Sequence, residues 1–244
     1  MNRFASAVLT AALMAGGAPA WAQGRSGDHD REALFAPDPS KVIAAELAFA
    51  RMAREKGTWT AFRETAVDDA LWPSPALTRV QDDLKGQPDP AQPIVWGPDA
   101  VWVSCDGSFA LSTGPATLAN GRRTRFATIW QRQRNVEYKW VLDQGFDLES
   151  DYAQPEFIGA KIAQCPYRVL QRRRFRDPDV VRNASWGSGT SNDGTLEWST
   201  AIAADCSRTL SVKVMQDGAM TEVFSRHSPA PTPPPGQPAP NCPA

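Results

Sequence analysis

The stretch "TIWQRQRNVEYKWVLDQG", residues 128–145, decides the fold because it contains two apolar strands joined by a polar turn. A turn of two or four residues pairs Trp130 with Val141 and Thr128 with Asp143, whereas a three-residue turn reverses the parity. The first register places on one face Phe126, Thr128, Trp130, Val141 and Asp143. The opposite face then carries Ile129, Gln131, Tyr138, Trp140 and Leu142. The predicted sheet is therefore apolar on both faces.

A second hairpin is predicted just upstream, in "AVWVSCDGSFALSTG" at residues 100–114. The Asp-Gly dipeptide at 106–107 is a strong signal for a two-residue turn between strands. This turn pairs Trp102 with Leu111. Together the two hairpins predict four antiparallel strands.

Helices are predicted before these strands. The segment "SKVIAAELAFARMAREKG", residues 40–57, has Ser40 as a helix N-cap and Gly57 as a stop signal. One face of this helix carries Ile43, Leu47 and Ala50. A second helix is predicted over 59–66, followed by an extended piece and a third helix over 76–85.

This order of elements resembles the nuclear transport factor 2-like superfamily, its SnoaL-like branch in particular, over residues 40–147. The resemblance rests on the extended piece "DDALWPSP", on a third helix ending in "LKG", and on strands ending in "IWQRQ…YKWVLDQG". It implies an α+β fold in which three N-terminal helices pack in a curved, cone-shaped antiparallel sheet around a cavity. Many members dimerise through the outer sheet face, so the resemblance also implies a homodimer through that face.

Asp143 is the candidate catalytic residue. In the predicted register it lies beside Trp130 and Val141, where desolvation raises the pKa of a carboxyl group. The alternative is a strand-end acid that only forms a hydrogen bond with Thr128. In the enzymes of the family an Asp works with a His or Tyr in an apolar cavity, and residues 40–147 contain no His. This absence counts against catalysis.

Amphipathic aromatic side chains suit the lining of an apolar cavity. The candidate ligand-binding residues are Trp72, Trp96, Trp102, Phe126, Thr128 and Trp130. Ordinary core packing is the alternative for the tryptophans. The predicted function is binding of a small, largely apolar molecule in the cone. The alternatives are a lyase, isomerase or hydrolase that uses Asp143, and an envelope protein-interaction module, because a fold does not fix a function.

The N-terminal residues have the pattern of a secretory signal. A basic residue precedes a short apolar run, which ends in Ala20-Trp21-Ala22. Cleavage after Ala22 gives a mature protein that begins at Gln23 and resides in the periplasm or outside the cell. No later apolar run is long enough to span a membrane.

The rest of the chain divides by composition. Residues 23–39 are polar and predicted to be mobile, and residues 148–170 form a predicted linker. Alternation with period two predicts an antiparallel β-meander over 171–227. A Pro-rich tail, residues 228–244, is predicted to be disordered.

Four cysteines in a chain bound for an oxidising compartment predict disulfide bridges. Three connectivities are open, and we expect Cys165 to pair with Cys206 because both lie in turns beside predicted strands. The sequence lacks CxxC spacing and has two histidines, so neither a metal site nor a cofactor is predicted. Loss of Arg3 with the signal leaves 25 basic and 27 acidic residues, a net charge of −2, which disfavours nucleic acid as a partner.

Overall fold

The computed structural model of the protein describes residues 37–165, 176–233 and 235–243. The predicted signal segment and the first part of the predicted meander, residues 171–175, lie outside the described residues. So does most of the polar segment 23–39. The described residues form one compact unit.

Two of the three predicted helices are confirmed. They are α2 (Pro39–Lys56) and α3 (Thr58–Thr65). The predicted N-cap is wrong, because Ser40 lies inside the first turn of α2. The N-cap is Asp38, whose side chain accepts a hydrogen bond from the Ser40 amide at 3.1 Å.

The predicted third helix is mostly wrong. Only Val80–Asp83 is helical, as α4. The residues just before it form strand β2 (Leu77–Arg79), which pairs with the extended piece, strand β1 (Ala66–Pro73). Strand pairing therefore replaces the first part of the predicted helix.

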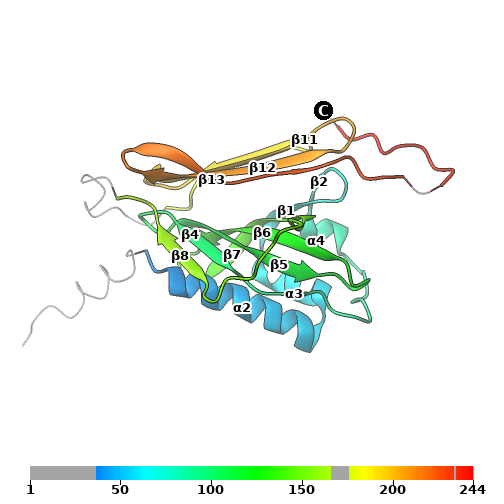
Figure 1. The fold of residues 1–244 in the computed structure, drawn as a ribbon, viewed down its shortest axis with the longest axis horizontal. Helices are drawn as coiled ribbons and strands as arrows, with labels where there is room; N and C mark the ends of the chain where they lie inside the picture. The colour runs from blue at the N-terminus through cyan, green and yellow to red at the C-terminus, as the bar shows by residue number, and fades with distance from the viewer. Residues whose placement is uncertain (1–36, 166–175, 234, 244) are drawn as a thin grey trace, which may run out of the picture. The chain divides into compact units, whose positions relative to one another are not determined.

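The first sheet has eight strands and curves over the helices (Figure 1). Their order is β2-β1-β7-β6-β5-β4-β8, and β3 pairs with β5. The further strands are β3 (Val95–Trp96), β4 (Ala100–Val103), β5 (Phe109–Thr117), β6 (Arg123–Arg132), β7 (Tyr138–Asp147) and β8 (Gly159–Ile162). The sheet is mixed, because β1 runs parallel to β7 and β8 runs parallel to β4. The predicted linker 148–170 thus contributes an edge strand.

The register of the upstream hairpin is confirmed, since Trp102 pairs with Leu111. The register of the β6–β7 hairpin is confirmed only in part. The Gln133 amide donates to the Glu137 carbonyl at 2.7 Å, which leaves a three-residue turn at 134–136. As expected for such a turn, the parity near it is reversed.

A β-bulge restores the predicted pairing farther from this turn. Trp130 pairs with Trp140, and the register shifts between Ile129 and Trp130, so that Thr128 pairs with Asp143 as predicted. Val141 is the extra residue and packs in the outer core, which corrects its predicted place beside Trp130. Tyr138 and Trp140 likewise belong to the inner core, contrary to prediction.

A second sheet contains five antiparallel strands in the order β13-β12-β11-β10-β9. Three of its strands follow the predicted alternation: β11 (Leu196–Ile202), β12 (Arg208–Gln216) and β13 (Ala219–Ser228). Two were not predicted: β9 (Val180–Arg182) and β10 (Trp186–Thr190). The sequence of β10 did not indicate a strand because it contains two glycines. Gly189 is needed there, since an added Cβ would lie 2.5 Å from Trp198 Nε1.

Each face of the first sheet has its own core. The inner face packs on α2 and α3. The core between them includes Phe49 and Phe62 of the helices and Trp130 of the sheet. The outer face contributes Leu111, Ile129 and Leu142 to a core shared with Trp198, Leu210 and Val212 of the second sheet. The second sheet therefore buries the outer face within the chain, which gives the two-sided apolar pattern an intramolecular explanation.

The predicted Cys165–Cys206 bridge is wrong. Cys105 pairs with Cys165, and Cys206 pairs with Cys242. The parallel pairing of β8 with β4 brings the residues after both strands together, so that the Cα atoms of Cys105 and Cys165 lie 5.2 Å apart. The second bridge fastens the end of the Pro-rich segment, where Cys242 is buried. At Cys242 this segment is therefore not the free tail that its composition suggests.

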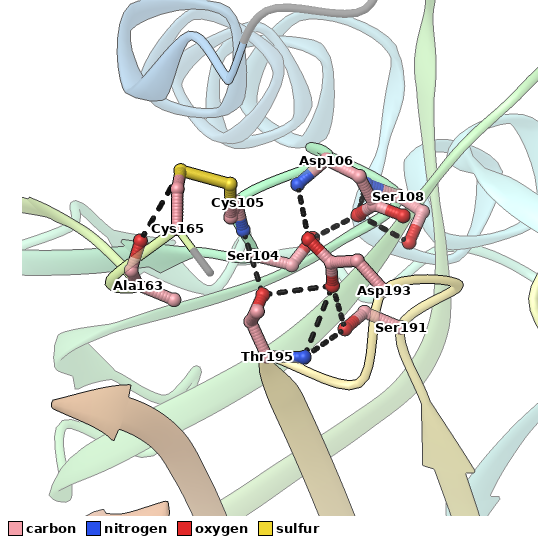
Figure 2. The surroundings of a disulfide bond; sticks show 9 residues. All are labelled: Ser104, Cys105, Asp106, Ser108, Ala163, Cys165, Ser191, Asp193 and Thr195. Atoms are coloured by element: carbon pink, nitrogen blue, oxygen red, sulfur yellow. Dashed lines mark hydrogen bonds between the residues drawn. A yellow bond between two sulfur atoms is a disulfide. The ribbon is translucent and has the colours of Figure 1, made fainter. Parts of the chain in front are cut away.

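A polar clasp beside the first bridge joins the two sheets (Figure 2). Asp193, in the β10–β11 turn, accepts from the Asp106 amide at 2.7 Å through Oδ2. Its Oδ1 accepts from Ser191 and Thr195 of its own turn. Thr195 Oγ1 in turn accepts from the Cys105 amide at 2.8 Å. The Asp193 carboxylate thus orders its own turn and holds it to the turn at Asp106, whose own carboxylate accepts from Ser104 and Ser108.

Candidate functional site

Two acids on the inner side of the first sheet are the most unusual groups of the structure. The first, Glu46, lies on the buried face of α2 and is fully buried. Trp96 Nε1 donates to its Oε1 at 2.6 Å, and Ser112 Oγ and Trp130 Nε1 donate to its Oε2 at 2.5 and 3.1 Å. Burial raises the pKa of Glu46, and these three hydrogen bonds oppose that shift. Glu46 is therefore a satisfied polar group inside an aromatic core.

The sequence contained a signal for Glu46 that the predicted helical face missed. The buried positions of α2 are Val42, Glu46, Phe49, Ala50 and Ala53. They follow the spacing of one helical stripe, and an acid within such a stripe marks a buried polar group. Leu47, which we placed on the buried face, is 47% exposed.

Asp143 is the second acid, and it differs from Glu46 in having a free oxygen. Thr128 Oγ1 donates to its Oδ2 at 2.7 Å, as the sequence suggested. Its Oδ1 has no hydrogen-bond partner among the described residues, and it retains accessible surface. The residue is thus mostly enclosed by protein, with Oδ1 left without a hydrogen-bond partner.

Burial raises the pKa of Asp143 to about 7. The hydrogen bond from Thr128 opposes this shift, and the charge of Glu46 adds to it. Near neutral pH the carboxyl is therefore divided between its protonated and ionised forms. It can donate a hydrogen bond in the first form and accept one in the second.

Trp72 lies beside Asp143 on the neighbouring strand. Leu71 pairs with Leu142 in parallel, so the next residue of each strand faces the inner side. The Trp72 ring lies 5.6 Å from Trp59, with both rings partly exposed. The pairing of the two strands therefore places an aromatic residue next to Asp143.

The structure brings five of the six predicted ligand-binding residues to the inner side. They are Trp72, Trp96, Phe126, Thr128 and Trp130. Trp102 does not join them, because it points to the opposite face of the sheet and packs on the outer core. Trp96 and Trp130 both donate hydrogen bonds to Glu46. Their ring centroids lie 4.7 and 6.2 Å from that of Phe49. Much of the predicted cone is therefore filled by side chains.

Two clefts lie away from this inner site. One of about 410 Å³ runs between β13 and the outer face of β4, with Trp102 and Arg125 in its lining. The other, of about 530 Å³, is lined by polar residues that include Asp69 and Arg182. Neither cleft includes Glu46 or Asp143.

The described residues contain no cluster of three or more His, Cys, Asp or Glu side chains placed to hold a metal. No helix among them is long and apolar enough to cross a membrane. Two disulfide bridges are typical of proteins outside the cytoplasm.

Solved structures of nuclear transport factor 2-like and ketosteroid-isomerase-like proteins match about half of the chain. A ketosteroid-isomerase-like protein from Parabacteroides distasonis shares 14% identity at a TM-score of 0.36, covering 48% of this chain and 98% of its own. A nuclear transport factor 2-like protein of unknown function from Pseudomonas putida shares 14% identity at a TM-score of 0.32, covering 49% and 94%. This likeness concerns the fold alone. A scan against protein-family models and a search of curated proteins found no match.

Proposed function

We propose that the protein acts outside the cytoplasm, after cleavage at Ala22, and binds a small, largely apolar molecule beside Asp143. The observation that carries the proposal is the free, accessible Oδ1 of a carboxyl group that is otherwise enclosed by protein. Ligand sites are mostly apolar with a few convergent polar groups. Asp143 supplies such a group, and Trp72 supplies apolar surface at its side.

The packing of the inner core limits the ligand to a small molecule. Phe49, Trp130 and Trp140 are at most 1% exposed and leave the deep part of the cone filled. The ligand therefore occupies the region near Trp59 and Trp72, where the side chains are partly exposed. A hydroxyl or similar polar group of the ligand faces Oδ1.

A matched pair of probes tests this proposal. Naphthalene and naphthol differ in one hydroxyl group, so calorimetric titration with both isolates the contribution of the acid. Above pH 7 the ionised Asp143 accepts from the naphthol hydroxyl, and we expect naphthol to bind more tightly than naphthalene. Asp143→Asn should weaken naphthol binding by about 5- to 150-fold, equivalent to about 1–3 kcal/mol, and should leave naphthalene binding unchanged.

Asp147→Asn is the matched control, because Asp147 is an exposed acid on the same strand. It should change neither affinity. The proposal would be contradicted if Asp143→Asn lowered the affinity for both probes equally, or if the wild type bound naphthol no more tightly than naphthalene.

A second candidate function is acid–base catalysis by Asp143, as in a lyase, isomerase or hydrolase. A pKa of about 7 favours it, because a general acid or base works best when its pKa is near the working pH. Thr128 is the hydrogen-bonded partner of this carboxyl. A nitrobenzisoxazole is a suitable probe, since removal of its ring proton by a base breaks the ring N–O bond and releases a coloured phenolate.

We expect the wild type to open the ring faster as the pH rises through about 7, and Asp143→Asn to abolish the acceleration. Asp147→Asn again serves as the control. A wild-type rate equal to that of the buffer would exclude this function for the probe class, and leave binding to be judged by the naphthol experiment.

A further inference from the structure

We propose that the free edge of β13 binds an uncharged, extended peptide segment of another protein as an added strand. This proposal is independent of the ligand proposed at Asp143. It concerns the cleft of about 410 Å³ beside β13.

The lining of this cleft shows that it follows the edge of the strand. Five consecutive residues of β13, 222–226, line it. Side chains of a regular strand alternate between its two faces, and a β-bulge at Val223 interrupts this alternation within the stretch. Lining by five consecutive residues is nevertheless typical of a cleft that follows the edge of a strand. β12 occupies the other edge, and β13 ends the sheet. The cleft therefore follows the unpaired edge for about 17 Å, at about 3.4 Å per residue.

The backbone at this edge has groups available for a new strand. Among the described residues, no other segment forms backbone hydrogen bonds with β13 on this side. The Ser225 carbonyl accepts instead from the guanidinium of Arg226 at 2.8 Å, which shows that it points away from β12. In an antiparallel ladder the N–H and C=O of one residue point to the same side, so the Ser225 amide also faces the cleft.

The side chains around the edge provide further contacts. Phe224 and Val223 supply apolar surface on the wall, and Trp102 lies across from them on β4. The indole N–H of Trp102 is buried and has no acceptor among the described residues.

The charges of the cleft favour an uncharged occupant. Its lining contains two acids and two arginines, and each is already engaged: Asp99 with Arg125, Glu222 with Ser211, and Arg226 with Glu149. Glu222 binds only the neutral Ser211 hydroxyl, whereas both arginines are paired with acids. An acidic side chain would therefore find no unpaired cation and would lose hydration. An extended segment of apolar and hydroxyl residues matches this lining, and strand addition is an established mode of peptide recognition.

The test uses a capped five-residue peptide of alternating threonine and valine. Its partner probe carries N-methyl groups on alternate residues, which removes the backbone donors of one edge. We expect the first peptide to shift the backbone amides of 222–226 and the Trp102 indole N–H in NMR spectra. N-methylation should weaken binding by at least about tenfold, and a glutamate-substituted peptide should also bind more weakly.

Ser225→Pro and Ser225→Ala are the matched protein variants. Proline removes an edge-facing amide while keeping the bonds to β12, whereas alanine keeps the amide. Proline should therefore reduce peptide affinity by at least about tenfold, and alanine should leave it unchanged. The N-methylated peptide provides the same comparison if the proline variant does not fold.

Three outcomes would overturn the proposal. The first is no binding at millimolar peptide, and the second is equal binding of the N-methylated peptide. The third is a wild-type dimer that Ser225→Pro converts to a monomer, because a second copy would then occupy the edge.

Discussion

Asp143 makes the stability of the protein depend on pH in a direction opposite to that of an ordinary paired acid. Its pKa has the ordinary value of 3.8 in the unfolded chain and is about 7 in the folded protein. Between these values the folded state holds a proton that the unfolded state has released. The free energy of unfolding therefore falls as the pH rises through this window. Below it both states are protonated, and above it both are ionised.

The size of the effect follows from the width of the window. It spans about three pH units, and each unit corresponds to about 1.36 kcal/mol. The ionised carboxylate thus lowers the wild-type stability above pH 7 by about 4 kcal/mol. Asp143→Asn is neutral at every pH, and its amide oxygen can still accept from Thr128. We expect the variant to match the wild type near pH 4 and to exceed its stability by about 3–5 kcal/mol near pH 8.

Urea unfolding from about pH 4 to about pH 8, with both disulfides intact, measures this difference. Burial raises the pKa of Glu46 in both proteins, so much of its effect on the pH dependence cancels when the two stabilities are subtracted. Asp147→Asn is the control and should not reproduce the gain in stability near pH 8. Parallel stability curves for wild type and Asp143→Asn would refute the reasoning, as would a carboxyl NMR titration of Asp143 near pH 4.

The remaining predictions concern covalent structure and stability. Non-reducing peptide mapping should recover both disulfide bridges of the structure, and free thiols would contradict this prediction. Removing either bridge should lower the free energy of unfolding by about 4 kcal/mol in the loop-entropy model. Gly57→Ala should lower the free energy of unfolding by more than about 1 kcal/mol, because Gly57 has a φ of 113° and a Cβ would lie 2.2 Å from Asp89 Cγ. Asp193→Ala should cost about 1–3 kcal/mol by freeing the clasp between the sheets, a loss visible in urea unfolding and absent if the clasp is unimportant. Intact mass of exported protein should place the mature N-terminus at Gln23, and retention of the preceding residues would show the signal assignment to be wrong.

Local patterns determined much of the fold. The cap and stop signals of the first helix, the Asp-Gly turn and the alternation of β11 to β13 each depend on neighbours within a few residues. The structure confirms the stop at Gly57, the register of the Asp-Gly hairpin and the three strands, whereas the predicted Ser40 cap is wrong. The pairing of Thr128 with Asp143 was also predicted, although by a two- or four-residue turn rather than the three-residue turn and bulge that produce it.

The candidate site was predictable only in part. Asp143 stood out because an acid ended an apolar strand, and the structure encloses it as expected. Glu46 was missed, since its role depends on which stripe of the helix meets the sheet. Trp102 was misplaced, because an aromatic residue looks the same in sequence whether its strand faces the helices or the second sheet.

By itself, the sequence determined those elements whose signals are local: helix ends, tight turns and the two-residue period of strands. Only the tertiary structure decided which distant residues meet. The parallel return of β8 to β4 selects Cys105 as the partner of Cys165, and the second sheet covers an outer face that could equally have met another chain. The physical reason is that pairing between distant segments depends on backbone hydrogen bonds and buried area. Every apolar strand offers both, so the sequence of one strand does not select its partner. The partner is selected only when the whole chain packs.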